Sequence, residues 1–284
     1  MIVATTPEFM SQMSSECRYW LKQQLGSIEK YQPIPGGHHN IWWCKSPSGQ
    51  YVLRQPNKQA IYGIDYQREQ IILQDLIPYH WAISGMFFTP DEPWLIYPYV
   101  EGQSVGQKQF YQNRHNWQQL CHIVTQLQSR QYLYKPRYKR VMRDYLYHYL
   151  TLARFAPQEA LAKAHEWLID FPRPSALSLN HHDLTSANLL ITPNRQLVIL
   201  DWEYAAFSDQ GWDCAVLAES FEFHPEQLLD LRQLYGLSEH RLEQYRLASR
   251  LLDLCWFSQL PLSSEHIRAW EKWDDSISFY RLDR

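Results

Sequence analysis

Apolar residues recur in short runs along the first third of the chain and at helical spacing along most of the rest. Two runs, Ile41–Cys44 and Tyr51–Arg54, flank a Ser-Pro-Ser-Gly-Gln turn, which is typical of a β-hairpin. A turn-rich loop precedes this hairpin, and Trp94–Val100 predicts a further strand. Helices are expected around 15–25, ending near Gly26, and through the segment that carries Glu69, Ile72, Leu73 and Leu76.

Beyond residue 100 the spacing of apolar residues is mostly helical. One helical face is formed by Trp117, Leu120, Cys121, Val124 and Leu127. Further helices are expected over 145–153, 161–169, 213–221, 225–235, 239–260 and 264–273. A strand-rich start followed by a helical remainder predicts an α+β fold with two lobes, residues 1–99 and 100–284.

A second hairpin is expected inside the helical part. Leu-Leu-Ile and Leu-Val-Ile-Leu flank a Thr-Pro-Asn-Arg-Gln turn. The first strand of a hairpin starts where the second ends, so Asn188 is expected beside Asp201, near a loop that contains His181 and Asp183. Such a site suits phosphoryl transfer from metal-bound ATP, because one acid meets a hydroxyl while the other oxygens hold Mg²⁺. The alternative, a polar turn in which Asp183 caps a helix, does not explain the second carboxylate.

Composition excludes several classes of protein. The 284 residues are 45% hydrophobic and 20% charged, with a formal net charge of −3, which argues against a binder of nucleic acid or of anionic membranes. The basic segment Tyr134–Arg143 is more consistent with a solvated linker or helix edge than with a phosphate patch. No run reaches the roughly 18 apolar residues of a membrane span. The five cysteines form no Cys-x-x-Cys pair and indicate a reduced, cytoplasmic protein rather than a disulfide or zinc framework.

The chain resembles the aminoglycoside phosphotransferase and choline kinase-like superfamily. The resemblance is strongest in the motifs His181-His-Asp-Leu-Thr-Ser-Ala-Asn188 and Leu200-Asp-Trp-Glu-Tyr-Ala205. It is weaker in Tyr51–Pro56 and Trp94–Gly102. Leu-Arg-Gln-Pro together with Asp-Trp-Glu-Tyr-Ala looks most like bacterial thiamine kinase. The resemblance implies a two-lobed protein-kinase-like fold, with a β-rich N-terminal nucleotide-binding lobe and a mainly helical C-terminal catalytic lobe. It also implies Mg²⁺, ATP as co-substrate and a small-molecule alcohol as acceptor.

The resemblance assigns roles position by position. Asp183 matches the catalytic base, and Asn188 and Asp201 match the Mg²⁺ ligands. His181 and Asp213 match residues that support the catalytic loop, although Asp213 would equally suit a cap of the next helix.

In the first lobe, Arg54 stands where many kinases have a phosphate-binding lysine. Arginine stays charged and binds phosphate bidentately, and Glu69 would pair with it; the alternative is that the two are unrelated surface charges. The nucleotide-binding candidates are Gly36, Gly37, Asn40, Arg54, Glu69, Tyr97 and Tyr99. The loop Gly36–Asn40 departs from Gly-x-Gly-x-x-Gly, and Asp201 is followed by Trp-Glu rather than Phe-Gly. These departures favour a small-molecule acceptor over a protein substrate.

The acceptor is expected to be a primary alcohol, with thiamine first. Aromatic residues in the helical lobe suit a cation, with attraction of about 0.5–2 kcal/mol per contact, and Trp256 is the candidate; core packing is the alternative for each tryptophan. Glu203 could hold the acceptor or join the metal site, and the alternative is an exposed or paired carboxylate. Choline, ethanolamine and aminoglycosides are the alternatives; the small acidic excess disfavours aminoglycosides. A catalytically inactive nucleotide-binding relative is the non-enzyme alternative.

Overall fold

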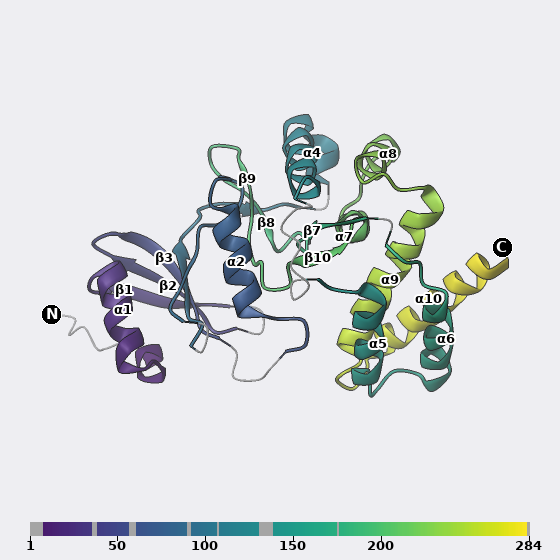
Figure 1. Cartoon of the computed structure of the whole chain (residues 1–284), viewed down its shortest axis with the longest axis horizontal. Coiled ribbons are helices and arrows are strands. Elements are labelled where there is room, and N and C mark those ends of the chain that lie inside the picture. The colour runs from purple at the N-terminus through teal and green to yellow at the C-terminus, as the bar shows by residue number, and fades with distance from the viewer. Residues whose placement is uncertain are drawn as a thin grey trace. The chain divides into compact units, whose positions relative to one another are not determined.

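The computed structural model describes residues 8–35, 39–56, 61–89, 92–106, 108–130, 139–174 and 176–282. The chain divides into two compact units (Figure 1). The first unit comprises residues 1–103 and 190–204, and the second unit comprises residues 104–189 and 205–284. None of the helices in the described ranges has the length and apolar character that crossing a bilayer requires.

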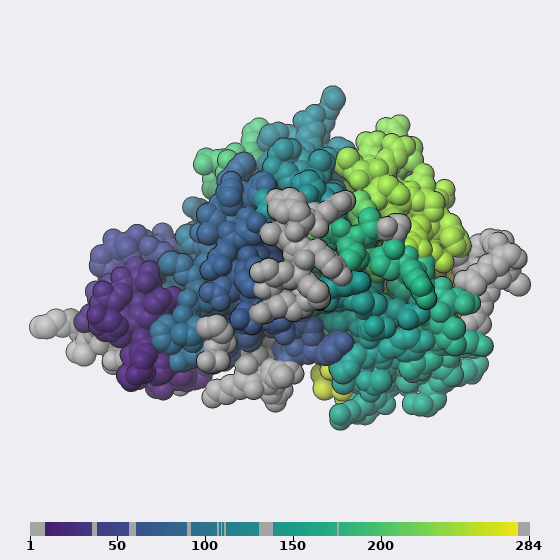
Figure 2. Space-filling view, in the orientation of Figure 1, coloured from purple at the N-terminus to yellow at the C-terminus, as the bar shows by residue number. Residues whose placement is uncertain are grey.

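The first unit is built on a five-stranded antiparallel sheet. Its strands, in the order β1-β2-β3-β5-β4, are β1 (Lys30–Ile34), β2 (Ile41–Ser46), β3 (Gly49–Arg54), β5 (Leu95–Pro98) and β4 (Met86–Phe87). A 3₁₀ helix (Glu8–Gln12) and the helices α1 (Ser15–Leu25) and α2 (Tyr66–Leu76) accompany the sheet. The space-filling view shows the purple segment with α1 at the surface of this unit (Figure 2).

The predicted β2–β3 hairpin is confirmed. Its register pairs Ile41 with Arg54 and Ser46 with Gly49, so two residues form the turn. Gly49 has a φ of 144°, which a glycine adopts without strain. The helix predicted before the hairpin ends at Gly26, as expected, with a φ of 76°. Inside this unit, α1 buries Cys17, Leu21 and Leu25 against Cys44, Leu53, Trp94 and Ile96 of the sheet.

β1 was not predicted, because its segment reads as part of the turn-rich loop. It lies at the edge of the sheet, and four of its five residues are exposed. Pro33 is tolerated there because an edge strand need not donate every ladder hydrogen bond. An exposed edge strand therefore lacks the apolar alternation by which strands are recognised.

The second predicted hairpin is also confirmed. β8 (Leu189–Ile191) and β9 (Leu197–Ile199) pair in a three-stranded sheet of order β6-β8-β9, and the short β6 (Gln103–Ser104) was not predicted. Arg195 in the turn has a φ of 61°.

The second unit is mainly helical. Its helices are α3 (Gln109–Gln112), α4 (Arg114–Gln128), α5 (Met142–Leu152), α6 (Gln158–Ile169), α7 (Trp212–Ser220), α8 (Pro225–Leu234), α9 (Glu239–Phe257) and α10 (Ser264–Leu282). β7 (Leu177–Asn180) and β10 (Ala206–Asp209) form an antiparallel pair that was not predicted. The long helix α9 packs against α5, α7 and α10 and so forms the centre of this unit.

Candidate active site

The loop that follows β7 in the second unit is held by Asp213, at the start of α7. The Asp213 carboxylate accepts hydrogen bonds from the backbone N–H groups of His181, at 2.7 Å, and His182, at 2.9 Å. Burial raises the pKa of Asp213 to about 7, while the two backbone hydrogen bonds act in the opposite direction. The side chain therefore fixes the backbone immediately before Asp183.

Two histidines complete the support of this loop. His181 is buried, and its Nδ1 accepts a hydrogen bond from the backbone N–H of Asp183 at 3.2 Å. His182 has a φ of 71°, a left-handed conformation that costs a non-glycine residue about 1–2 kcal/mol. Its Nε2 is 2.8 Å from the hydroxyl of Ser208 in β10, a contact that helps to hold this conformation.

Asp183 and Asn188 lie together, as their spacing predicts. The Asn188 amide donates to the Asp183 backbone carbonyl at 2.9 Å and to its carboxylate Oδ2 at 2.7 Å. Because the amide nitrogen faces Asp183, the Asn188 Oδ1 oxygen is the atom with which this residue would ligate a cation. Asp183 is half-buried, which leaves part of its carboxylate accessible to an acceptor hydroxyl.

In the first unit, Arg54 lies among three carboxylates. Its guanidinium is 2.5 Å from Glu69 of α2, 3.1 Å from Asp201 Oδ1 and 3.6 Å from Glu203 Oε2. The ion pair between Arg54 and Glu69 is thus the one predicted. Both side chains are buried, so the alternative of two unrelated surface charges is wrong.

The carboxylates around Arg54 outnumber its positive charge. Partial desolvation by the surrounding protein raises the pKa of Asp201 to about 7, the charge of Glu203 acts in the same direction, and Arg54 opposes both. Burial likewise raises the pKa of Glu69. Asp201 also has a φ of 56°, and its side chain keeps 40% of its surface exposed. An accessible oxygen ligand in an anionic surrounding suits a hard divalent cation.

Asp201 in the first unit and the Asn188 amide oxygen in the second unit are each of the ligand type that Mg²⁺ prefers. Within the described ranges, no group of three or more His, Cys, Asp or Glu side chains is arranged to hold a metal. Mg²⁺ is commonly held by one or two protein oxygens together with substrate phosphates, so two ligands are sufficient. Asn188 belongs to the second unit and Asp201 to the first, and their convergence on one ion stays a prediction.

Glu203 is buried and already has partners inside the first unit. Its Oε2 is hydrogen-bonded to Nε2 of His39, in addition to the neighbouring Arg54. Contact of Glu203 with an acceptor stays a prediction. His39 was not predicted as a site residue, because it is 164 positions from Glu203 in the chain and only its place after two glycines marks it.

The remaining nucleotide-binding candidates lie at the sheet or outside the described residues. Asn40 donates to the Gln55 side chain at 3.1 Å. Tyr97 in β5 pairs with Val52 in β3, and burial raises the pKa of its hydroxyl. Tyr99 is exposed and follows β5. Gly36 and Gly37 lie outside the described residues.

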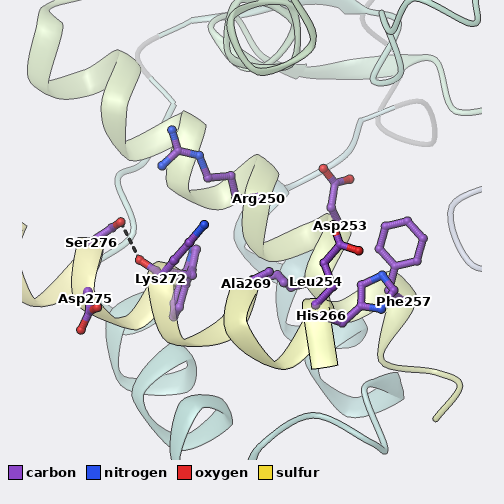
Figure 3. Close-up of a pocket in the computed structure, with 11 residues that line it drawn as sticks. Arg250, Asp253, Leu254, Phe257, His266, Ala269, Lys272, Asp275 and Ser276 are labelled. Atoms are coloured by element: carbon purple, nitrogen blue, oxygen red, sulfur yellow. Dashed lines mark hydrogen bonds between the residues drawn. The ribbon is translucent and has the colours of Figure 1, made fainter. Parts of the chain in front are cut away.

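A cavity of about 710 Å³ opens between α9 and α10 in the second unit. Figure 3 shows the rings of Phe257 from α9 and His266 from α10 side by side, while the Asp253 carboxylate of α9 points away from α10. Their centroids are 4.8 Å apart and the planes are 29° from parallel. The surrounding protein raises the pKa of Asp253 to about 7, and the charges of Asp183 and Glu219 act in the same direction. Asp253 is exposed at this wall of the cavity.

Asp253 lines the cavity, whereas Trp256 packs against α5. The Trp256 ring packs 6.0 Å from Tyr149 of α5, and Trp256 is not among the described residues that line the cavity. Sequence periodicity identified the helix α9 correctly, and contact of Trp256 with an acceptor stays a prediction.

The chain was compared with known proteins. The model of the phosphotransferase enzyme family matches residues 30–246, and none of the curated proteins compared with the chain matches it. Among solved structures, the choline kinase LicA from Streptococcus pneumoniae has a TM-score of 0.70 at 16% identity, covering 94% of this chain and 100% of that one. An ethanolamine kinase from Plasmodium vivax has a TM-score of 0.68 at 15% identity, covering 90% and 85%.

An ADP-bound aminoglycoside phosphotransferase, APH(2'')-Ib, has a TM-score of 0.64 at 14% identity, covering 92% of this chain and 97% of that one. At these identities the likeness shows the fold, which is the mixed α+β fold of protein kinases with a β-rich N-terminal and a helical C-terminal part, as predicted. The family match covers more than half of the sequence. This chain belongs to the phosphotransferase enzyme family.

Proposed function

We propose that this enzyme transfers the γ-phosphate of ATP to the primary alcohol of a small cationic molecule, with thiamine as the first candidate. The observation that carries the proposal is the arrangement of Asp183 with Asn188 on a loop fixed by Asp213. A base held in this way would meet an acceptor hydroxyl in one geometry, which lowers the barrier to transfer.

Each unit contributes separate groups to this reaction. Asp183 accepts the proton of the acceptor hydroxyl. Asn188 and Asp201 would hold Mg²⁺, which would neutralise phosphate charge and orient the transferred group. Arg54, held by Glu69, binds phosphate.

The cavity between α9 and α10 supports a cationic acceptor. Asp253 supplies a carboxylate in its wall, and the stacked Phe257 and His266 rings supply aromatic surface. Cation–π attraction is worth about 0.5–2 kcal/mol per contact. We place the acceptor cation beside Asp253 and Phe257, while contact of the acceptor with Trp256 stays the prediction from sequence.

The candidate acceptors are supported by different observations. Thiamine is supported by the sequence patterns Leu-Arg-Gln-Pro and Asp-Trp-Glu-Tyr-Ala alone. Choline and ethanolamine are supported by the similarity to solved kinases of these two alcohols. ATP as donor is supported by the structure of LicA in complex with AMP.

The test is ADP release from Mg·ATP with thiamine, choline, ethanolamine, an amino sugar and methylthioribose as acceptors, beside Asp183→Asn. Thiamine-stimulated release that the variant lacks would support the proposal in full. Stimulation by another alcohol would keep the reaction and change the acceptor. Binding of ATP without turnover for any acceptor would favour the non-enzyme alternative.

A further inference from the structure

His39 links two distant segments of the first unit. The ring is buried at the start of β2, and its Nε2 is hydrogen-bonded to Oε2 of Glu203, in the segment that follows β9. An ionised carboxylate only accepts hydrogen bonds, so Nε2 is the donor in this contact when Glu203 is ionised. The loop before β2 is thereby connected to the segment that contains Asp201.

The same Glu203 oxygen also faces Arg54. Oε2 of Glu203 is 3.6 Å from Arg54 Nη1, whose guanidinium pairs with Glu69 and Asp201 as well. One guanidinium cannot fully compensate three buried or half-buried carboxylates. The hydrogen bond from His39 satisfies part of Glu203 and so weakens its attraction for Arg54.

A second observation argues that this histidine is not retained for stability. Its Nδ1 is buried and has no hydrogen-bond partner among the described residues. A buried polar atom without a partner costs stability. An apolar residue of similar size would avoid that cost, but it would remove the hydrogen bond between His39 and Glu203.

We propose that His39 is a positioning residue for nucleotide binding, which holds Glu203 so that Arg54 remains available to the phosphates. Without this donor, Glu203 draws the Arg54 guanidinium toward itself and away from Asp201 and the nucleotide. The inference rests on the proposed function, because it takes Arg54 as a contact of the ATP phosphates.

The test uses His39→Leu, which removes the donor, and His39→Gln, whose side-chain amide offers a hydrogen to Glu203. We expect His39→Leu to weaken the affinity for ADP, measured by titration calorimetry in Mg²⁺, by about tenfold. His39→Gln should stay within about threefold of wild type. His80→Ala, at an exposed histidine of the same unit, is the control. Should His39→Leu not fold, His39→Asn replaces it, because its shorter amide does not reach Glu203.

Glu203→Gln is an independent test of the proposal, because it removes the negative charge to which His39 is hydrogen-bonded. The double variant His39→Leu/Glu203→Gln should bind ADP no more weakly than Glu203→Gln alone. Losses that simply add, or a fall in melting temperature for His39→Leu with unchanged ADP affinity, would overturn the inference.

Measurements on the wild-type protein distinguish failure of the proposed function from failure of the role of His39. If wild type binds ADP and phosphorylates an acceptor while His39→Leu binds ADP equally well, the proposed function stands and the role of His39 is refuted. If wild type does not bind ADP, the proposed function fails and the role of His39 fails with it.

Discussion

The conformations of His182 and Asp201 are unfavourable for the residues that adopt them. Both have a positive φ, at 71° and 56°, although neither is glycine, and each costs about 1–2 kcal/mol. His182 directly precedes Asp183, and Asp201 is a candidate metal ligand. Strained backbone of this kind is found at functional sites, where surrounding contacts hold it in place. Aspartate and asparagine tolerate this region better than most residues, so Asp201→Asn removes the charge with little added strain.

The role of Asp183 as base is tested by Asp183→Asn. The substitution keeps the size of the side chain and removes its ability to accept the acceptor proton. We expect kcat to fall by about 10²–10⁴, while the affinity for ADP stays near that of wild type. Single-turnover kinetics and calorimetry separate the two effects; a kcat within threefold of wild type would exclude Asp183 as the base.

Asp209 in β10 gives a prediction about pH. Burial raises its pKa to about 7, and Arg241 and Lys139 only partly oppose this. Between the ordinary Asp value of 3.8 and pH 7 the folded state keeps the proton and the unfolded state loses it, so stability falls as pH rises through this window. Asp209→Asn removes the titrating group and should abolish that fall.

The free energy of unfolding of Asp209→Asn minus that of wild type should therefore rise by about 2–3 kcal/mol when the pH is raised from 5 to 8. Urea unfolding at both pH values measures this difference. Asp230→Asn, at an exposed position of α8, is the control and should show no such gain. An equal change for both variants would show that Asp209 is not protonated in the folded state.

At the scale of elements, local signals predicted much of this fold. The β2–β3 and β8–β9 hairpins each have a short turn with Pro and Gly or Asn between apolar runs, and such turns specify pairing locally. β7 and β10 were missed because each has only four residues, and both bury polar side chains, such as Ser178 and Ser208. Their pairing depends on tertiary contacts that no local pattern encodes.

For the candidate site too, local patterns predicted the contacts within one loop and missed those between distant segments. Asp183 and Asn188 were predictable because their spacing lies within one loop. The contact between His39 and Glu203 joins segments far apart in the chain, and sequence alone contains no signal for it. Trp256 was chosen because it follows Leu251, Leu252 and Leu254 on this helix, and its contact with an acceptor stays a prediction. Asp253 was not considered, because α9 packs against α5, α7 and α10 and a helix surrounded in this way has no single apolar face that indicates its cavity side.

The α9 face is tested by Asp253→Asn. Loss of the carboxylate should raise the KM for a cationic acceptor by about tenfold, with the affinity for ADP unchanged, because Asp253 is not among the proposed nucleotide or metal contacts. Asp230→Asn serves as the matched control and should leave the KM as in wild type. An unchanged acceptor KM in Asp253→Asn would place the acceptor elsewhere, and Trp256→Leu would then be the next variant to test.

At the scale of the whole molecule, the proposed chemistry requires both units. Arg54, Glu69 and Asp201 belong to the first unit, and Asp183, Asn188 and Asp253 belong to the second. Variants of the first group should therefore weaken nucleotide binding, and Asp253 variants should weaken acceptor binding. This separation follows from where the charges lie and does not depend on which alcohol is the acceptor.

Ligand-induced stabilisation tests the metal ligands in the intact protein. A ligand that binds only the folded state at 100 times its Kd adds about 2.7 kcal/mol to the free energy of unfolding. ADP with Mg²⁺ should therefore raise the melting temperature by several degrees, and ADP with EDTA should raise it less. In Asp201→Asn the two increases should become equal, because the carboxylate that holds Mg²⁺ is gone while Arg54 remains. If Mg²⁺ still adds to the melting temperature of Asp201→Asn as it does in wild type, Asp201 is not the metal ligand.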